Sequence, residues 1–167
     1  MAAQSRPVLK VPFSKLDLFA EVAALLGIIL EVTITFFYWY ALPARIPTHV
    51  GFNGQPDSWG GKGSLIALVV VSLVLYVGLT LLERYPHIYN YPVQITEENA
   101  PRQYSIARSL LVWVKLEMAW IFAVLQWQTI QVALGRAAGL GNMLVLTIII
   151  VNMLTIGVGL YKAFRAK

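Results

Sequence analysis

The sequence predicts an all-α integral membrane protein, a four-helix bundle closed on its outer side by a loop rich in proline and glycine. Its 167 residues are 58% hydrophobic and only 13% charged, about half the charged share of soluble domains. Four apolar stretches are each long enough to cross a hydrocarbon core of about 30 Å as a helix. They cover about residues 17–42, 64–82, 109–134 and 140–161. We therefore expect residues 1–167 to form a single four-span membrane domain.

Local signals predict where these helices begin and end. Asp17 is the expected N-cap of the first helix, and Pro43 is expected to stop it after an aromatic cluster suited to a membrane interface. In the polar connector after the second helix, Thr96 predicts the cap of a short helix that Pro101 interrupts. The short turn 135–139 predicts that the last two helices are antiparallel neighbours.

Lysine and arginine are distributed unequally between the two sides that four spans define. Nine of them lie on the side that carries both termini, and three lie on the other side. Because cytoplasmic loops carry an excess of these residues, both termini are expected in the cytoplasm and loop 42–63 outside it. Orientation in the membrane then explains the net charge of +5. The expected partner is the lipid bilayer of the cell membrane, and not nucleic acid.

Three ionisable residues are singled out within the predicted spans, where an unpaired charge costs several kcal/mol. They are Glu31 in the first span and Lys115 and Glu117 in the third. Lys115 and Glu117 are two positions apart, so on a helix they face nearly opposite ways and should not pair with each other. A structural ion pair between Glu31 and Lys115 is the leading expectation. The alternatives are a proton or ion relay through Glu31 and Glu117, or solvated surface charges at the ends of slightly different spans.

Aromatic and amide side chains recur along the later helices. Trp113, Trp120 and Trp127 are spaced seven residues apart in the third span. Such a stripe is typical of a helix-packing surface rather than of a cofactor site. The amides expected to hydrogen-bond between helices at modest gain are Gln126, Gln128, Gln131 and Asn152.

The loop 42–63 gathers most of the side chains with specific chemistry. The candidates for a ligand-binding or structural role there are His49, Asn53, Asp57, Trp59 and Lys62. A compact loop would bring His49 and Asp57 together, and Arg45 and Lys62 predict salt bridges with Asp57. Because His49 and Asp57 are too few for a convincing ligand set and cysteine is absent, no metal or other cofactor is expected.

Catalytic motifs are missing from the sequence. It contains no HExxH, no GxSxG and no serine–histidine–aspartate pattern. The other histidine, His87, lies in the connector predicted to be cytoplasmic, across the bilayer from His49. The chain is therefore expected not to be an enzyme.

The same loop carries a family resemblance. Leu42-Pro43, Ile46-Pro47-Thr48-His49, Gly51-Phe52-Asn53-Gly54-Gln55-Pro56-Asp57, Trp59 and Lys62 resemble a bacterial domain of unknown function. That domain also forms the N-terminal part of SdpI-type immunity proteins, which protect cells from a secreted killing-factor toxin. The later run Glu98-Asn99-Ala100-Pro101-Arg102-Gln103-Tyr104 and Lys115 are similar to stand-alone members. The resemblance implies a multi-pass membrane protein in toxin immunity or signalling. It assigns no catalytic residue, and the immunity proteins carry a further transmembrane domain beyond four spans.

Three functional hypotheses follow. The leading one is a non-enzymatic membrane binding or sensing module whose outward loop recognises an extracytoplasmic peptide through Ile46, Phe52 and Trp59. The second is an accessory structural subunit of a larger complex, in which the tryptophan stripe faces another membrane protein. A weaker third is a membrane enzyme or transporter that uses the intramembrane glutamates and lysine.

Overall fold

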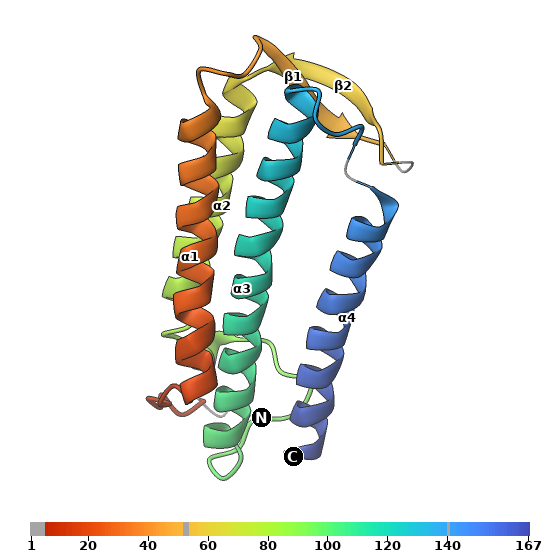
Figure 1. The fold of residues 1–167 in the computed structure, drawn as a ribbon. Helices are drawn as coiled ribbons and strands as arrows, with labels where there is room; N and C mark the ends of the chain where they lie inside the picture. Colours follow the sequence, from red (N-terminus) through yellow and green to blue (C-terminus); the bar gives the residue numbers. More distant parts are fainter. Residues whose placement is uncertain (1–5, 52–53, 140) are drawn as a thin grey trace.

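The computed structural model describes residues 6–51, 54–139 and 141–167, with four long helices and one hairpin (Figure 1). Among the described residues, all four helices are long and apolar enough to cross a membrane, as the sequence predicted. The elements are α1 (Lys15–Tyr38), β1 (Arg45–Val50), β2 (Pro56–Gly61), α2 (Gly63–Leu82), the short 3-10 helix η1 (Pro86–Ile88), α3 (Ala100–Ala133) and α4 (Asn142–Arg165).

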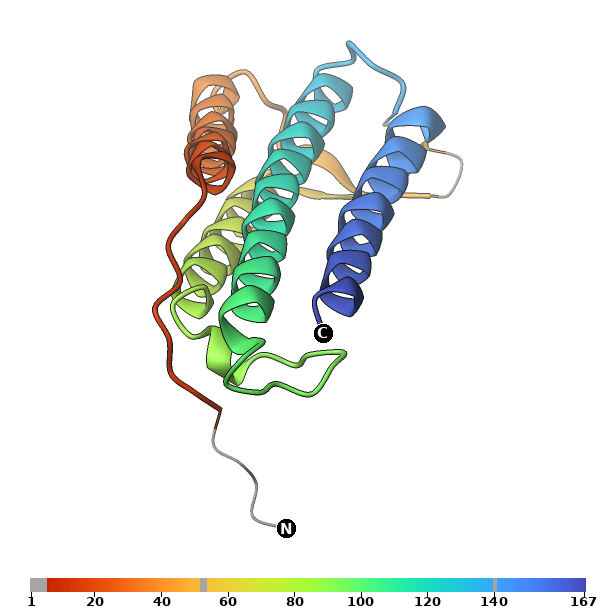
Figure 2. The same cartoon turned by 90° about the horizontal axis from the view of Figure 1, so that it is seen from below.

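Helix α3 is the centre of the bundle. Seen from the end that carries both termini, α1 and α2 lie on one side of α3 and α4 lies on the other (Figure 2). The last two helices run antiparallel and are joined by a short turn, as predicted from the sequence.

Small residues allow α1 and α3 to approach closely. Ala20, Ala24 and Gly27 on α1 and Ala119 and Ala123 on α3 are all buried. A Cβ added to Gly27 would lie only 3.2 Å from the carbonyl carbon of Ala119 and 3.3 Å from its Cβ. Without a hydrophobic driving force between helices in lipid, such close packing is what holds membrane helices together.

Helix α1 begins earlier than predicted because Ser14, and not Asp17, is its N-cap. The Ser14 hydroxyl accepts from the backbone N–H of Asp17, and the Asp17 carboxylate accepts from the backbone N–H of Ser14, both at 3.0 Å. This reciprocal capping box satisfies two backbone donors at the helix start. The helix also ends at Tyr38, before Pro43 is reached, and the chain continues through turns.

Helix α3 begins at Ala100, so the prediction that Pro101 interrupts a short helix is wrong. Pro101 lies in the first turn, where its missing N–H would have no helical partner in any case. This early start brings Gln103 against the end of α4. Gln103 Nε2 donates to the carbonyls of Ala163 at 2.9 Å and Ala166 at 3.0 Å, at the end of α4 where carbonyl groups lack the full set of helical donors.

Loop 42–63 contains a two-stranded antiparallel sheet, so the strictly all-α expectation is wrong for this segment. β1 and β2 pair from Arg45 opposite Gly61 to Val50 opposite Pro56, with irregular register around His49. Gly54 near the tip has a φ of 75°, a conformation that glycine adopts without steric cost. Ile46 anchors the hairpin, since it is fully buried in an apolar cluster with Leu65 and Ile130. The predicted folded cap is therefore present as a hairpin.

The polar connector and the N-terminal segment pack together at the opposite end. Arg108 of α3 donates to the carbonyls of Val11 and Pro12, and its guanidinium lies 4.1 Å from the centre of the Phe13 ring. The Tyr104 hydroxyl donates to the carbonyl of Pro7 at 3.1 Å. These contacts fix the extended N-terminal segment against the start of α3.

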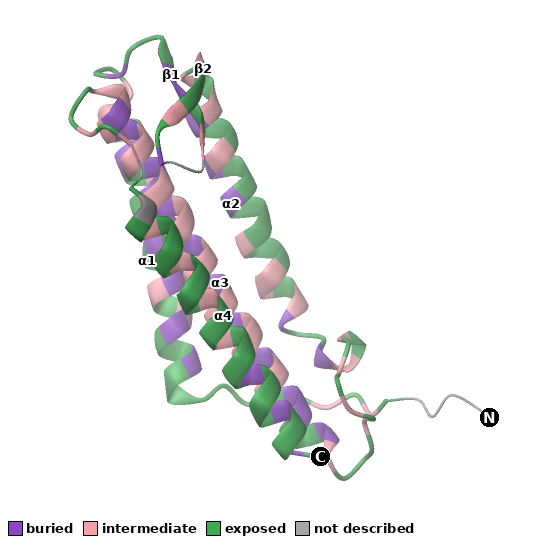
Figure 3. Ribbon diagram, turned by 90° about the vertical axis from the view of Figure 1, so that its right-hand side faces the viewer, coloured by how far each residue is buried: buried purple, intermediate pink, exposed green. Residues whose placement is uncertain are grey.

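Helix α4 is the least covered of the four helices. Exposed positions run along most of its length (Figure 3), and α3 is the helix against which it packs. Its exposed side chains are mostly large and apolar, which suits contact with lipid tails.

Candidate functional site

His49 and Asp57 form a hydrogen-bonded pair across the hairpin, and the sequence analysis expected a compact loop to bring them together. His49 Nδ1 lies 2.6 Å from Asp57 Oδ1. The side chains remain 68% and 52% exposed, so the pair faces solvent and contributes little to stability. Its polar atoms are accessible to a ligand.

The other loop candidates hold the hairpin in place. Lys62 Nζ donates to the backbone carbonyl of Trp39 at 3.1 Å and lies 4.9 Å from the centre of the Trp39 indole ring. Arg45 donates to the carbonyl of Trp59 at 3.3 Å, while the Trp59 side chain is half exposed. The predicted salt bridges from Arg45 and Lys62 to Asp57 are therefore wrong, because both cations bind backbone oxygens instead. Asn53 lies outside the described residues.

A hollow of about 620 Å³ lies beneath the hairpin. Its rim includes His49 and Asp57, and its walls include Leu65 of α2, Leu125 of α3 and Val145 of α4. The hollow thus joins the polar pair of the loop to an apolar interior. Among the described residues, no three histidine, aspartate or glutamate side chains converge as metal ligands.

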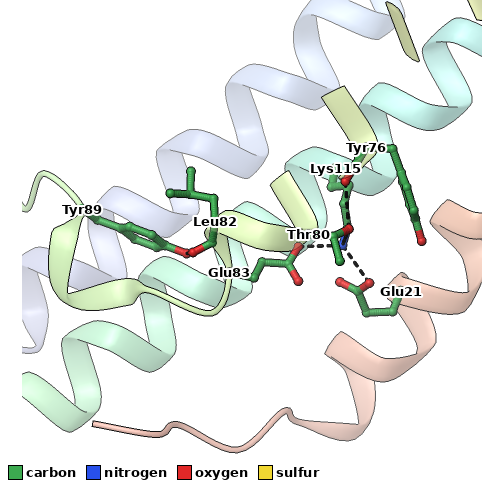
Figure 4. A network of polar contacts seen from close by, with 7 residues as sticks. All are labelled: Glu21, Tyr76, Thr80, Leu82, Glu83, Tyr89 and Lys115. Carbon is green, nitrogen blue, oxygen red and sulfur yellow. Dashed lines mark hydrogen bonds and ion pairs between the residues drawn. The ribbon is translucent and has the colours of Figure 1, made fainter. Parts of the chain in front are cut away.

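Lys115 does not pair with Glu31; that prediction is wrong. Its Nζ lies 2.7 Å from Glu21 Oε2 and 2.6 Å from Glu83 Oε1, and it donates to Thr80 Oγ1 at 3.0 Å (Figure 4). An ammonium group has three N–H donors, and this site supplies three acceptors. The ring of Tyr76, 5.1 Å from Nζ, covers the group further. Lys115 is fully buried, with hydrogen bonds to Glu21 and Thr80 and an ion pair with Glu83.

The register between α1 and α3 explains why Glu31 is out of reach. Gly27 lies against Ala119, so Glu31 is level with Ala123, eight residues beyond Lys115. At 1.5 Å per residue this is about 12 Å along the axis. Lys115 instead meets Glu21 and Glu83, two acids that lie within reach of it at the junction of α1, α2 and α3.

Tyr89 contacts the end of α2, next to the site where Lys115 meets Glu21 and Glu83. Its hydroxyl donates to the carbonyl of Leu82 at 2.9 Å (Figure 4). Burial raises the pKa of Tyr89 to about 12, so the phenol remains a donor at neutral pH. The connector thereby holds Glu83 at the helix end where Lys115 meets it.

Glu31 lies in a separate, fully buried polar site between α1, α2 and α3. Ser72 Oγ is 2.5 Å from Glu31 Oε2 and 3.0 Å from the carbonyl of Val69. A hydroxyl has one proton, so a bond to Val69 requires that Glu31 donates to Ser72. The other carboxyl oxygen of Glu31 has no partner among the described residues, and a buried, unpaired carboxylate is costly. A neutral Glu31 that donates to Ser72 would satisfy both bonds.

Replacement of Glu31 by glutamine should leave the free energy of unfolding within about 1 kcal/mol, because an amide reproduces a neutral donor and acceptor of similar shape. Infrared difference spectra should show the C=O stretch of a protonated carboxyl in the wild type and its loss in Glu31→Gln. If Glu31 carried an unpaired charge in the wild type, Glu31→Gln would instead be strongly stabilising. The wild-type spectrum would then lack the C=O band of a protonated carboxyl.

Glu117 faces α4 and not Lys115, as its spacing predicted. The Thr155 hydroxyl donates to Glu117 Oε1 and links the two helices. Two tryptophans of the predicted stripe contact α1: Trp120 Nε1 donates to the carbonyl of Ala23 at 3.0 Å, and Trp127 packs edge-on against Tyr38. The stripe therefore serves helix packing in part, as expected.

The residues missed in the sequence are Glu21, Thr80 and Glu83, which surround Lys115, and Ser72, which binds Glu31. Glu21 had a detectable signal, since it is a second acid inside the apolar run of the first span. Thr80 and Ser72 had none, because hydroxyl residues are common in membrane helices.

The four helices are long and apolar enough to cross a membrane, which fits a multi-pass membrane protein. Residues 26–73 match the family model of a domain of unknown function, DUF1648. The matched segment includes Glu31, the hairpin and Ser72, so it covers the buried acid and the His49–Asp57 pair.

A curated relative is an uncharacterized protein of Archaeoglobus fulgidus, 32% identical over 59 residues. The alignment covers 30% of this chain and 32% of the relative, so the chain spans about a third of that protein. No solved structure matches the chain.

Proposed function

We propose that the protein is a non-enzymatic membrane receptor module that binds an amphipathic extracytoplasmic ligand in the hollow beneath its hairpin. The observation that supports this most is the hollow itself, whose volume of about 620 Å³ lies within the usual range of ligand sites, about 300–1,000 Å³. The proposal places the hairpin outside the cell and both termini in the cytoplasm, following the excess of basic residues at the terminal end.

The lining defines the chemistry of the ligand. Leu65, Leu125 and Val145 offer an apolar surface, and the exposed His49–Asp57 pair offers polar atoms at the rim. A ligand with an apolar body and a hydrogen-bonding end fits this arrangement, as a hydrophobic peptide would. The resemblance of the loop to SdpI-type immunity proteins supports a toxin peptide as that ligand, and hence a role in immunity or signalling.

The test compares the molecules that purified variants retain in mild detergent, measured by native mass spectrometry. Thr129→Trp should fill the hollow, because Thr129 lines it. Val71→Trp is the matched control, since Val71 is 48% exposed on α2, away from the hollow. We expect the wild type and Val71→Trp to retain the same ligand. Thr129→Trp should bind that ligand about tenfold more weakly or worse, which corresponds to a loss of about 1.4 kcal/mol in binding free energy.

A second variant separates the polar rim from the apolar walls. His49→Ala combined with Asp57→Ala should weaken retention of the same ligand without removing the hollow. If Thr129→Trp retains every molecule that the wild type retains, the proposal is contradicted. The hairpin would then serve only to close the bundle.

The exposed surface of α4 favours a second candidate function, an accessory subunit of a larger membrane complex. Trp120 is also 41% exposed, on the central helix. The same spectra would reveal a partner chain retained at fixed stoichiometry. A strictly monomeric protein would count against this function.

A further inference from the structure

Three basic side chains converge at the end of the bundle that carries both termini. Arg102 from the first turn of α3 and Lys162 and Arg165 from the last turn of α4 line a hollow of about 540 Å³. Within the described part of the chain, none of the three forms an ion pair with a carboxylate. Arg165 donates to the neutral hydroxyl of Tyr161 at 3.0 Å. The hollow is therefore rich in uncompensated positive charge.

These cations are not needed to cap α4. Gln103 Nε2 already donates to the carbonyls of Ala163 and Ala166. Lys162 and Arg165 are both exposed, so their charged groups are available to an anion.

A largely apolar groove leads from this basic hollow along α4 toward the middle of the bundle. A second hollow, of about 550 Å³, lies between the start of α1, α3 and α4 and shares Ser105, Ile106 and Lys162 with the first. Its inner wall includes Leu110 and Leu154. Leu154 precedes Lys162 by eight residues, or about 12 Å along the axis of α4. A ligand with an anionic head and an apolar tail would match both hollows at once.

Asp17 is the acid that lines the apolar groove, and it is engaged elsewhere. It accepts from the backbone N–H of Ser14 at 3.0 Å and from the hydroxyl of Ser109 at 2.6 Å. Its charge is held by the capping box at the start of α1 and is not directed at the cations of the basic hollow.

We propose that this end of the bundle binds one anionic phospholipid, with its phosphate among Arg102, Lys162 and Arg165 and an acyl chain in the groove between α1, α3 and α4. Guanidinium groups bind phosphate oxygens in a bidentate manner, and basic pockets between membrane helices select anionic lipid headgroups. The inference is independent of the proposed function of the hairpin, because the two sites lie at opposite ends of the helices.

The test measures lipid retention by native mass spectrometry after reconstitution with equal amounts of phosphatidylglycerol and phosphatidylcholine. The wild type should prefer phosphatidylglycerol. Arg102→Gln combined with Arg165→Gln should reduce that preference about tenfold or more. The matched control is Lys10→Gln combined with Arg84→Gln, which removes two exposed charges from the same end of the protein and should keep the preference.

The outcomes separate the sources of the anion. If both double variants lose the preference for phosphatidylglycerol equally, the lipid is attracted diffusely to the charged surface and the proposal is overturned. A wild type without a preference for phosphatidylglycerol would also overturn it. Displacement of phosphatidylglycerol by millimolar inorganic phosphate would identify a free-phosphate site and overturn the lipid assignment. Val158→Trp, which narrows the groove, should reduce lipid retention and leave the binding of soluble glycerol phosphate unchanged.

Discussion

Replacement of Lys115 by methionine should lower the free energy of unfolding by about 3–5 kcal/mol, the usual cost of removing one partner from a buried ion pair. Lys115 is fully buried and is bound by Glu21 and Glu83. Without the ammonium group, two carboxylates would face each other at the junction of α1, α2 and α3. Their mutual repulsion adds to the cost of leaving them without a cation.

The measurement is unfolding in mixed detergent micelles, followed by circular dichroism as the denaturing detergent is increased. Lys10→Met is the matched control, because Lys10 is exposed and surface substitutions stay within about 0.5 kcal/mol. Addition of Glu21→Gln and Glu83→Gln to Lys115→Met should restore much of the lost stability, since it removes the unpaired charges. A Lys115→Met protein as stable as the control would contradict this account of the cluster.

Replacement of Ala119 by leucine should destabilise the protein by about 1–3 kcal/mol through overpacking between α1 and α3. Ala119 is fully buried, and Gly27 on the facing helix has no room for even one added carbon atom at its ordinary contact distance. A leucine side chain would push the helices apart. The bond from Trp120 to the carbonyl of Ala23 and the bond from Gln126 to Thr35 would then lengthen.

Ala67→Leu is the control for this substitution, because Ala67 is exposed on α2 and the same added atoms would project into lipid. The two variants can be compared by thermal unfolding in the same detergent. Equal stability of Ala119→Leu and Ala67→Leu would show that the α1–α3 contact adapts freely, contrary to the close approach at Gly27.

The four-helix membrane architecture could be predicted from the sequence alone. Four apolar runs of membrane-spanning length can be stable only with their backbone groups bonded internally, which requires helices. The pairing of His49 with Asp57 was also predictable, because the Gly-rich turns between them favour a compact loop. The separation of Lys115 from Glu117 followed from helical spacing alone.

The ends of the helices were less predictable, since small local preferences decide them. A capping box makes Ser14, and not the predicted Asp17, the N-cap of α1. Pro101 lies in the first turn of α3 and does not break the helix. The hairpin was missed as a sheet because its β2 strand, Pro56–Gly61, lacks the alternating apolar pattern that identifies strands. Its strand conformation depends on pairing with β1.

The pairing of the buried charges could not be predicted, because it depends on how the helices pack against each other. Composition required that Lys115 find a counter-ion, but the choice depended on the axial register of α1 against α3. The contact of Gly27 with Ala119 sets that register. The register brings Glu21 next to Lys115, whereas Glu31 hydrogen-bonds with Ser72. A shift of a few residues along the helix axis would pair different acids, because each residue advances a helix by 1.5 Å and side-chain contacts extend only a few ångströms.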